Sequence, residues 1–138
     1  MKVELSYSNI KYRLKEARKT KKWILACLKK LGFKKAHIEF NFVSKSRILS
    51  INKEFLNHNY FTDIVTFSYT AGENEISAEI YICPWQVKKN AHLYQQKFPE
   101  EMRRVMIHGI LHCAGYHDLT VAEIRAMREA ENLYLKSY

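Results

Sequence analysis

The chain has 138 residues, of which 23 are lysine or arginine and 14 are aspartate or glutamate, so its formal net charge is +9. This length and an apolar share of 47% are those of a single globular domain over residues 1–138, which excludes a low-complexity or disordered chain. No apolar run approaches the roughly 20 residues of a membrane span, and the first residues lack the apolar core of a signal peptide, so we expect a cytoplasmic protein.

The first half of the chain predicts a helix, a strand and a second helix. Residues 23–31 place their apolar side chains on one helical face, and Gly32 offers the C-cap. Residues 37–43, with the sequence HIEFNFV, alternate apolar and polar side chains as a half-buried strand does. Residues 45–56 again have an apolar helical face, and Ser44 precedes them as a plausible N-cap.

Two further strands and two helices follow. Residues 63–70 and 75–83 are strand-like, and the short link between them contains Gly72, which predicts an antiparallel hairpin. Pro84 suits the first turn of one helix, and Pro99 suits that of another, which runs to about residue 114. The later part of this second helix is apolar nearly all round apart from its histidines, so we expect it to be the buried central helix.

The start of the last helix is signalled by two local motifs. Thr120 and Glu123 have the spacing of a capping box, and Leu119 and Ile124 have that of a hydrophobic staple. With strands in the middle of the chain and helices on both sides, the fold class is α+β, with a small mixed or antiparallel sheet of about four strands and about five helices.

The distribution of charge and of cysteine indicates the class of partner. Positive charge is concentrated early, in residues 11–23, and such an excess favours a polyanion, which from charge alone is RNA, DNA or an anionic membrane. Cys27, Cys83 and Cys113 are odd in number and widely spaced, so we expect reduced thiols and no disulfide-linked partner. We interpret Cys113 as a packing residue, because a side chain next to a helical ligand faces away from it.

Residues 108–118, HGILHCAGYHD, contain half of the six histidines. His108 and His112 are four residues apart, so on a helix they project from one face and can hold one divalent ion, and burying two unpaired imidazoles on an apolar helix would be costly. Gly115 allows the chain to leave the helix and to bring back a third ligand, either His117 or Asp118. Three protein ligands and one water are typical of catalytic zinc sites, in which the ion activates the water.

The spacing of this segment also resembles the zinc-protease pattern H-E-x-x-H-x-x-G-x-x-H. The glutamate of that pattern, which is the general base, would fall at position 109, where this chain has glycine. A protease is therefore disfavoured, and the residues assign no protein general base.

The motif H-G-x-L-H-x-x-G-Y, formed here by His108, Gly109, Leu111, His112 and residues 115–116, resembles the signature of the YbeY family of metal-dependent endoribonucleases. Residues 62–67, TDIVTF, are similar to the T-D-V-L-S-F segment of that family, and residues 78–83 are similar to its G-D-I strand. The resemblance covers roughly residues 37 to 135.

The resemblance implies the YbeY α+β fold and a zinc ion held by three side chains in a basic cleft that admits RNA. It implies cleavage of single-stranded RNA in ribosomal RNA maturation and quality control of the small ribosomal subunit, and thus no membrane partner. The third ligand of the family lies six residues after the second histidine, which is Asp118 here. The family usually ends the motif D-H, however, so His117 stays the alternative ligand.

The chain departs from the family before the T-D pair. Leu56 stands at the place of a family arginine and His58 at that of a lysine, so His58 is either a surface histidine or a substrate contact. Asp63 either holds a loop at the start of its strand or orients a ligand imidazole. Because the arginine is missing, a ribosome-associated binding factor with a structural metal and little turnover is the alternative function.

Overall fold

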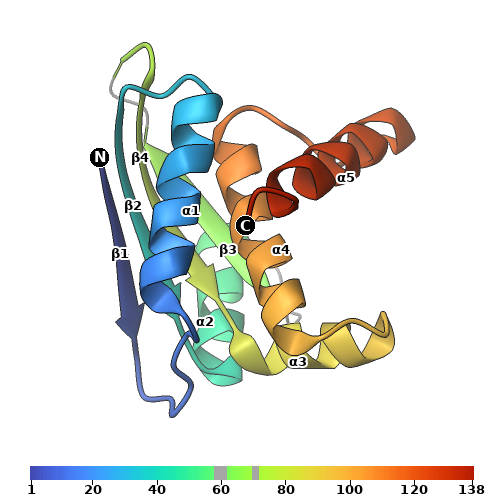
Figure 1. Cartoon of the computed structure of the whole chain (residues 1–138). Helices are drawn as coiled ribbons and strands as arrows, with labels where there is room; N and C mark the ends of the chain where they lie inside the picture. Colours follow the sequence, from blue (N-terminus) through green and yellow to red (C-terminus); the bar gives the residue numbers. More distant parts are fainter. Residues whose placement is uncertain (58–61, 70–71) are drawn as a thin grey trace.

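The computed structural model describes residues 1–57, 62–69 and 72–138, which form four strands and five helices (Figure 1). In chain order these are β1 (Lys2–Tyr7), α1 (Ala17–Lys30), β2 (Lys35–Phe42), α2 (Lys45–Leu56), β3 (Ile64–Tyr69), β4 (Glu75–Ile82), α3 (Pro84–Leu93), α4 (Phe98–Cys113) and α5 (Val121–Leu135). The predicted α+β class is confirmed.

The four strands form one mixed sheet in the order β1-β2-β4-β3. β1 pairs with β2 and β2 with β4 in parallel, whereas β3 pairs with β4 in an antiparallel hairpin, as predicted. β3 therefore lies at an edge of the sheet, with Ile64 opposite Ile82 and Ser68 opposite Ala78. This edge is the part of the sheet that contributes to the candidate site.

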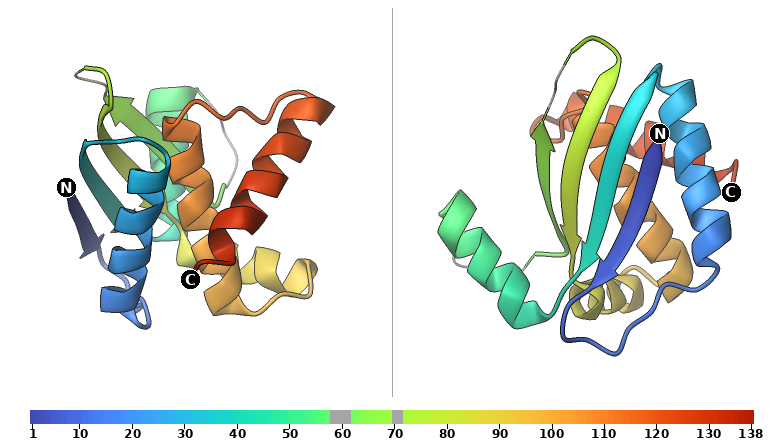
Figure 2. Two further views of the ribbon diagram at one scale, coloured as in Figure 1. Left: turned by 45° about the horizontal axis from the view of Figure 1, so that its top comes forward. Right: turned by 90° about the vertical axis from the view of Figure 1, so that its left-hand side faces the viewer.

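One face of the sheet is covered by α1 and α4, α5 packs on α4, and α2 stands apart from them beside β3 (Figure 2). The main core lies between this face and the helices, and its largest fully buried side chains include Phe40, Phe42, Ile80 and Ile82 from the strands and Met106 from α4. No helix in residues 1–57, 62–69 or 72–138 is long and apolar enough to cross a bilayer.

β1 was not predicted, although its sequence carries the signal. Val3, Leu5 and Tyr7 alternate with polar residues and pack on the core, which is the pattern of a half-buried strand. The first helix also begins earlier than predicted, at Ala17. Its added first turns are largely exposed and basic, so they lack the apolar periodicity on which the prediction depended.

α4 is the central helix, and eight of its residues are buried. Gly109 lies on its face toward the sheet, where a Cβ atom would come within 2.9 Å of Ile64 Cδ1 and 3.3 Å of Ile80 Cδ1. Carbon atoms pack at about 3.5–4.0 Å, so a side chain at this position would require Ile64 and Ile80 to shift. The glutamate that the protease pattern requires at this position is thus disfavoured by packing.

The predicted capping box of α5 is confirmed. The Thr120 hydroxyl accepts a hydrogen bond from the Glu123 backbone N–H, and the Glu123 carboxylate accepts one from the Thr120 backbone N–H. The hydrophobic staple, in contrast, is not a buried contact, because Leu119 and Ile124 are both largely exposed. The helix start is therefore held by polar capping.

Candidate metal centre

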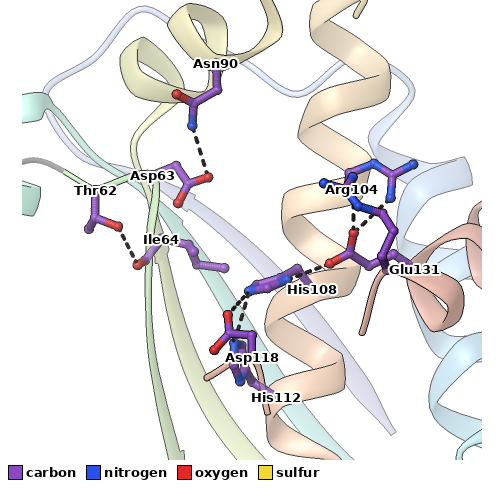
Figure 3. Close-up of polar contacts among 10 residues, drawn as sticks. Thr62, Asp63, Ile64, Asn90, Arg104, His108, His112, Asp118 and Glu131 are labelled. Carbon is purple, nitrogen blue, oxygen red and sulfur yellow. Dashed lines mark hydrogen bonds and ion pairs between the residues drawn. The ribbon is translucent and has the colours of Figure 1, made fainter. Parts of the chain in front are cut away.

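His108 and His112 lie one turn apart on α4, and their rings meet edge to face near the end of the helix (Figure 3). The two Nε2 atoms are 3.0 Å apart, and the ring centroids are 4.5 Å apart. Both side chains are partly buried, with exposed fractions of 24% and 30%. One edge of each imidazole is therefore accessible to an ion or a bound molecule, while the rest of the ring is held by the protein.

The chain after α4 turns back toward these two rings. Gly115 has a φ of 101°, a left-handed conformation that favours glycine, and its N–H donates to the carbonyl oxygen of His112. The segment between this turn and the capped start of α5 carries Asp118 to the histidines. Its Oδ2 atom lies 3.3 Å from His112 Nε2 and 3.5 Å from His108 Nε2. His117 is exposed and is not part of this group.

The three ligand atoms fit a tetrahedral ion. Ligands at about 2.0–2.1 Å from zinc lie about 3.3–3.4 Å from one another in a regular tetrahedron. The three separations here are 3.0, 3.3 and 3.5 Å. Two imidazole nitrogens and one carboxylate oxygen are also donors that zinc accepts. The donor set therefore fits one divalent ion with a fourth position left to solvent or substrate.

Glu131, which the sequence analysis did not single out, completes this arrangement from α5. Its Oε2 atom lies 2.7 Å from Nδ1 of His108, and its side chain is only 6% exposed. A carboxylate at this distance accepts the Nδ1 proton and leaves the lone pair of a neutral ring on Nε2. Nε2 is the atom that faces His112 and Asp118, so Glu131 sets the tautomer that a metal ligand needs.

Glu131 is itself held by Arg104. The Nη1 atom of Arg104 donates to Oε1 of Glu131 at 2.8 Å (Figure 3). Its Nη2 atom donates to Oδ1 of Asn132 at 2.8 Å. Burial by itself raises the pKa of Glu131, but the hydrogen bonds from His108 and Arg104 outweigh it and lower that pKa. Glu131 is therefore a stable carboxylate at neutral pH.

The electrostatic environment of His108 favours positive charge. Burial by itself lowers the pKa of the imidazole, but the hydrogen bond to Glu131 and the carboxylates of Asp118 and Asp63 raise it overall. The same three carboxylates would stabilise a divalent cation at Nε2. The charge of the site and its donor geometry therefore point to the same kind of ligand.

Asp63 lies just before β3 and lines the same cleft as His108. Its Oδ2 atom accepts a hydrogen bond from the Asn90 side chain at 3.3 Å, whereas the Nδ1 atom of His108 bonds to Glu131 (Figure 3). Burial raises the pKa of Asp63, and the nearby His108 opposes this rise. Asp63 thus faces the ligand group without a direct hydrogen bond to either imidazole.

Two hollows meet at the ligand group. One, of about 320 Å³, lies between α3, α4 and α5 and contains Arg104, Arg128 and Glu131. The other, of about 450 Å³, follows the inner side of β3 and contains Leu56 and His112. Both are lined by four further residues, which are Asp63, Ile64, His108 and Asp118. The candidate ligands are therefore reached by a continuous cleft.

Three further positions, Leu56, His58 and Cys113, were considered in the sequence. Leu56 lines the β3 side of the cleft, so no cation is supplied from its position. His58 lies outside the described residues. Cys113 is half-buried and packs against the main core, and burial raises its pKa to about 11, in agreement with a packing role.

A second group of ligand-type side chains, Glu4, His37 and Glu39, lies on the uncovered face of the sheet. Nε2 of His37 is 2.6 Å from Glu4, and Nζ of Lys2 is 3.1 Å from the same carboxylate. The lysine places a positive charge where an ion would bind, so this group is a surface cluster of ion pairs.

The fold and the site define a small α+β protein with a His–His–Asp group at the end of its central helix. The family model described as Endoribonuclease YbeY matches residues 2–138, and the chain belongs to this family. The family resemblance predicted from the sequence is thereby confirmed.

Individual relatives of this chain carry the same family name. A protein named Endoribonuclease YbeY from Parabacteroides distasonis is 41% identical over 110 residues, which cover 80% of this chain and 77% of the relative. One of the same name from Azobacteroides pseudotrichonymphae is 39% identical over 117 residues, 85% of this chain and 84% of the relative. A solution structure from Thermotoga maritima superposes with a TM-score of 0.70 at 28% identity, covering 98% of this chain and 87% of that one.

Proposed function

We propose that this protein is a zinc-dependent endoribonuclease that cleaves single-stranded RNA. By family resemblance, its substrate is ribosomal RNA of the small subunit, and it acts in maturation and quality control in the cytoplasm as one domain spanning residues 1–138. The observation that carries the proposal is the convergence of His108 Nε2, His112 Nε2 and Asp118 Oδ2 within 3.5 Å of one another, in a chain of the endoribonuclease family.

Glu131 and Asp63 have different roles beside such a metal ion. A zinc ion bound there would act as a Lewis acid on a phosphoryl oxygen and lower the pKa of a nearby water. Glu131 accepts the Nδ1 proton of His108 and keeps its Nε2 lone pair directed at the ligand group. Asp63 contributes a half-buried carboxyl with a raised pKa to the same cleft, where such a group is suited to proton transfer.

Basic residues of the cleft suit the phosphate backbone of RNA. Arg104 is fixed by Glu131 and Asn132, so it is a stationary positive charge on one wall. Arg128 lines the same hollow, and its side chain is 62% exposed, with its nearest carboxylate oxygen, on Glu131, 3.9 Å away. A guanidinium that is accessible and only weakly paired can bind a phosphate with two hydrogen bonds.

The test is cleavage of labelled single-stranded RNA together with measurement of bound metal. We expect the purified protein to contain about one zinc ion and to cut the RNA, and His112→Ala to lose both the ion and cleavage. A His112→Ala protein that is free of contaminating nuclease and still cleaves at the wild-type rate would refute the proposal. His92→Ala, at an exposed histidine of α3, is the matched control and is expected to keep both properties.

One observation favours a second candidate function. Leu56 lines the cleft at the place where the family resemblance implies an arginine, so that side of the site has lost a phosphate-binding cation. A ribosomal RNA-binding factor with a structural metal would tolerate this change. It predicts RNA binding without cleavage under any divalent metal, which the same assay distinguishes from the nuclease.

A further inference from the structure

A cavity of about 580 Å³ lies away from the metal centre, between the segment that precedes α1 and the first turns of α4. We name it the α1–α4 cavity, and its walls are Tyr12, Arg13, Leu14, Lys15, Glu16, Thr20, Phe98, Pro99, Met102 and Arg103. None of these residues takes part in the site described above. The cavity is therefore available for a second task.

The interior of the α1–α4 cavity is aromatic and apolar. The rings of Tyr12 and Phe98 stand 5.7 Å apart between centroids and are tilted by 57°. Met102 and Pro99 add apolar surface beside them. Flat, weakly polar rings such as nucleobases bind to surfaces of this kind by stacking, and they do so with little dependence on sequence.

The rim of the same cavity is positively charged. Arg103 stacks on Tyr138, with its Cζ atom 4.2 Å from the ring centroid, and Arg13 stacks on Tyr7 at 4.6 Å. Within the described parts of the chain, neither Arg103 nor Lys15 makes an ion pair with a carboxylate. Their charges are thus free to meet an anion at the mouth of the cavity.

The cavity also opens into the most basic stretch of the chain. Residues 11–22 contain seven lysines and arginines and a single acid, Glu16. An occupant with a negative charge is therefore favoured, and a phosphate is the anion that arginine pairs bind best. Aromatic walls and a cationic rim together match a nucleotide, which carries a base and a phosphate.

A third hollow, of about 310 Å³, lies between the α1–α4 cavity and the metal centre. It shares Arg103 with the cavity and shares Glu101 and Arg104 with the cleft of the metal centre. On α4, Arg103 and Phe98 precede His108 by five and ten residues, which is about 7.5 and 15 Å along the helix axis. A single strand of a few nucleotides spans such a distance.

We propose that the α1–α4 cavity binds one nucleotide of the RNA strand whose scissile bond lies at the metal centre. The base packs in the cavity against the rings of Tyr12 and Phe98, and its phosphate lies on the cations of the rim, Lys15 and Arg103. This inference rests on the proposed function, since it takes RNA as the substrate. It adds a binding subsite for RNA at a distance from the ligand group.

The test measures the binding of labelled single-stranded RNA with phosphorothioate linkages, which resist hydrolysis, to the intact protein with metal. The variant pair Lys15→Gln and Arg103→Gln removes two charges from the rim. We expect it to weaken binding of a 12-nucleotide strand at least tenfold and to lower the slope of log affinity against log salt by about 0.7–1.4, which is the value for one or two phosphate contacts of a single strand. Binding of a dinucleotide, which is too short to reach from the metal centre to the cavity, is expected to change less than twofold.

The matched control pair is Lys29→Gln and Lys53→Gln, which removes the same net charge at exposed positions outside the cavity. If the control pair weakens RNA binding as much as Lys15→Gln with Arg103→Gln does, the attraction is non-specific and the proposal is overturned. If the protein with Lys15→Gln and Arg103→Gln binds the 12-nucleotide strand as the wild type does, the proposal is also overturned. The cavity would then be a site for a protein or a small-molecule ligand.

Crosslinking tests the aromatic part independently of affinity. 4-Thiouridine placed at successive positions of the 12-nucleotide strand is expected to crosslink at one position to the peptide that contains Tyr12 or Phe98. Crosslinks confined to the metal cleft would contradict the subsite. A strand that crosslinks in the cavity but is never cleaved by the wild-type protein would refute the nuclease and keep the subsite, so the two failures are distinguishable.

Discussion

Replacement of Glu131 tests whether a carboxylate behind His108 controls metal binding. Glu131→Gln keeps the shape of the side chain, and its amide oxygen can still accept the Nδ1 proton, but the negative charge 2.7 Å from the imidazole is lost. Changes to groups that orient metal-ligating histidines cost about 10–100-fold in metal affinity. That loss corresponds to about 1.4–2.8 kcal/mol. We expect the glutamine variant near the lower bound and Glu131→Ala, which also loses the hydrogen bond, near the upper one.

The same substitution weakens the contact to Arg104, so its effect on folding has to be measured separately. The ion pair joins a guanidinium that is 24% exposed to a carboxylate that is 6% exposed, and Arg104 keeps its bond to Asn132. Loss of one such charged bond costs about 1–3 kcal/mol. A domain with about 5–15 kcal/mol of stability stays folded after this loss.

The assay is a competition titration of zinc against a chelating indicator, run beside chemical denaturation of the same samples without metal. Glu129→Gln, an exposed neighbour on α5, is the control and is expected to bind zinc as the wild type does. If both Glu131 variants bind zinc within twofold of the wild type while their stability falls, Glu131 only anchors Arg104. The reasoning about the His108 tautomer would then be refuted.

Three further predictions concern the turn, the packing of α4 and the thiols. Asp118→Ala is expected to lower zinc affinity at least 100-fold and His117→Ala less than twofold, and the reverse order in a zinc titration would show that His117 is the ligand. Gly109→Ala is expected to lower the free energy of unfolding by about 1 kcal/mol. Overpacking against Ile64 and Ile80 costs about 1–3 kcal/mol, and the higher helix propensity of alanine offsets about 1 kcal/mol of this cost. A Gly109→Ala protein that is more stable than the wild type in urea denaturation would contradict the close approach. Burial raises the pKa of Cys27 to about 11 from an ordinary value of 9.0, so above pH 9 the thiol ionises in the unfolded chain and stays neutral in the folded one. The free energy of unfolding is therefore expected to fall between pH 9 and 11 by up to about 1.4 kcal/mol per pH unit for this thiol. Cys27→Ala is expected to make this fall shallower. A Cys27→Ala protein whose stability falls as steeply as that of the wild type would mean that Cys27 titrates normally.

Much of the fold could be predicted because its signals are local. The capping box at Thr120, the proline at the start of α3 and the alternation of β2 each depend on residues close together in the sequence. β1 has the same local alternation, so the strand itself is predictable, whereas its place in the sheet is not. Parallel pairing of β1 with β2 depends on contacts across more than thirty residues, which no local pattern shows.

The candidate ligands were predictable for the same reason, since His108, His112 and Asp118 fall within eleven residues. Glu131 could not be placed, because its contact with His108 depends on how α5 packs on α4. A signal was present, however. Met127, Ala130 and Tyr134 form the buried stripe of α5, and Glu131 lies within that stripe. A carboxylate on the apolar face of a helix needs a buried partner, and His108 and Arg104 are those partners.

The position of α5 has a further consequence for how the site is assembled. Asp118 lies in the segment that leads into α5, and Glu131 lies on α5 itself, so two of the polar groups around the histidines depend on a single helix. Local opening that releases the last helix would dismantle the ligand group while leaving the sheet and the central helix folded. Binding of a metal ion and the closing of residues 115–138 would then be one linked equilibrium, and slow hydrogen exchange in α5 would measure how fully the site is occupied.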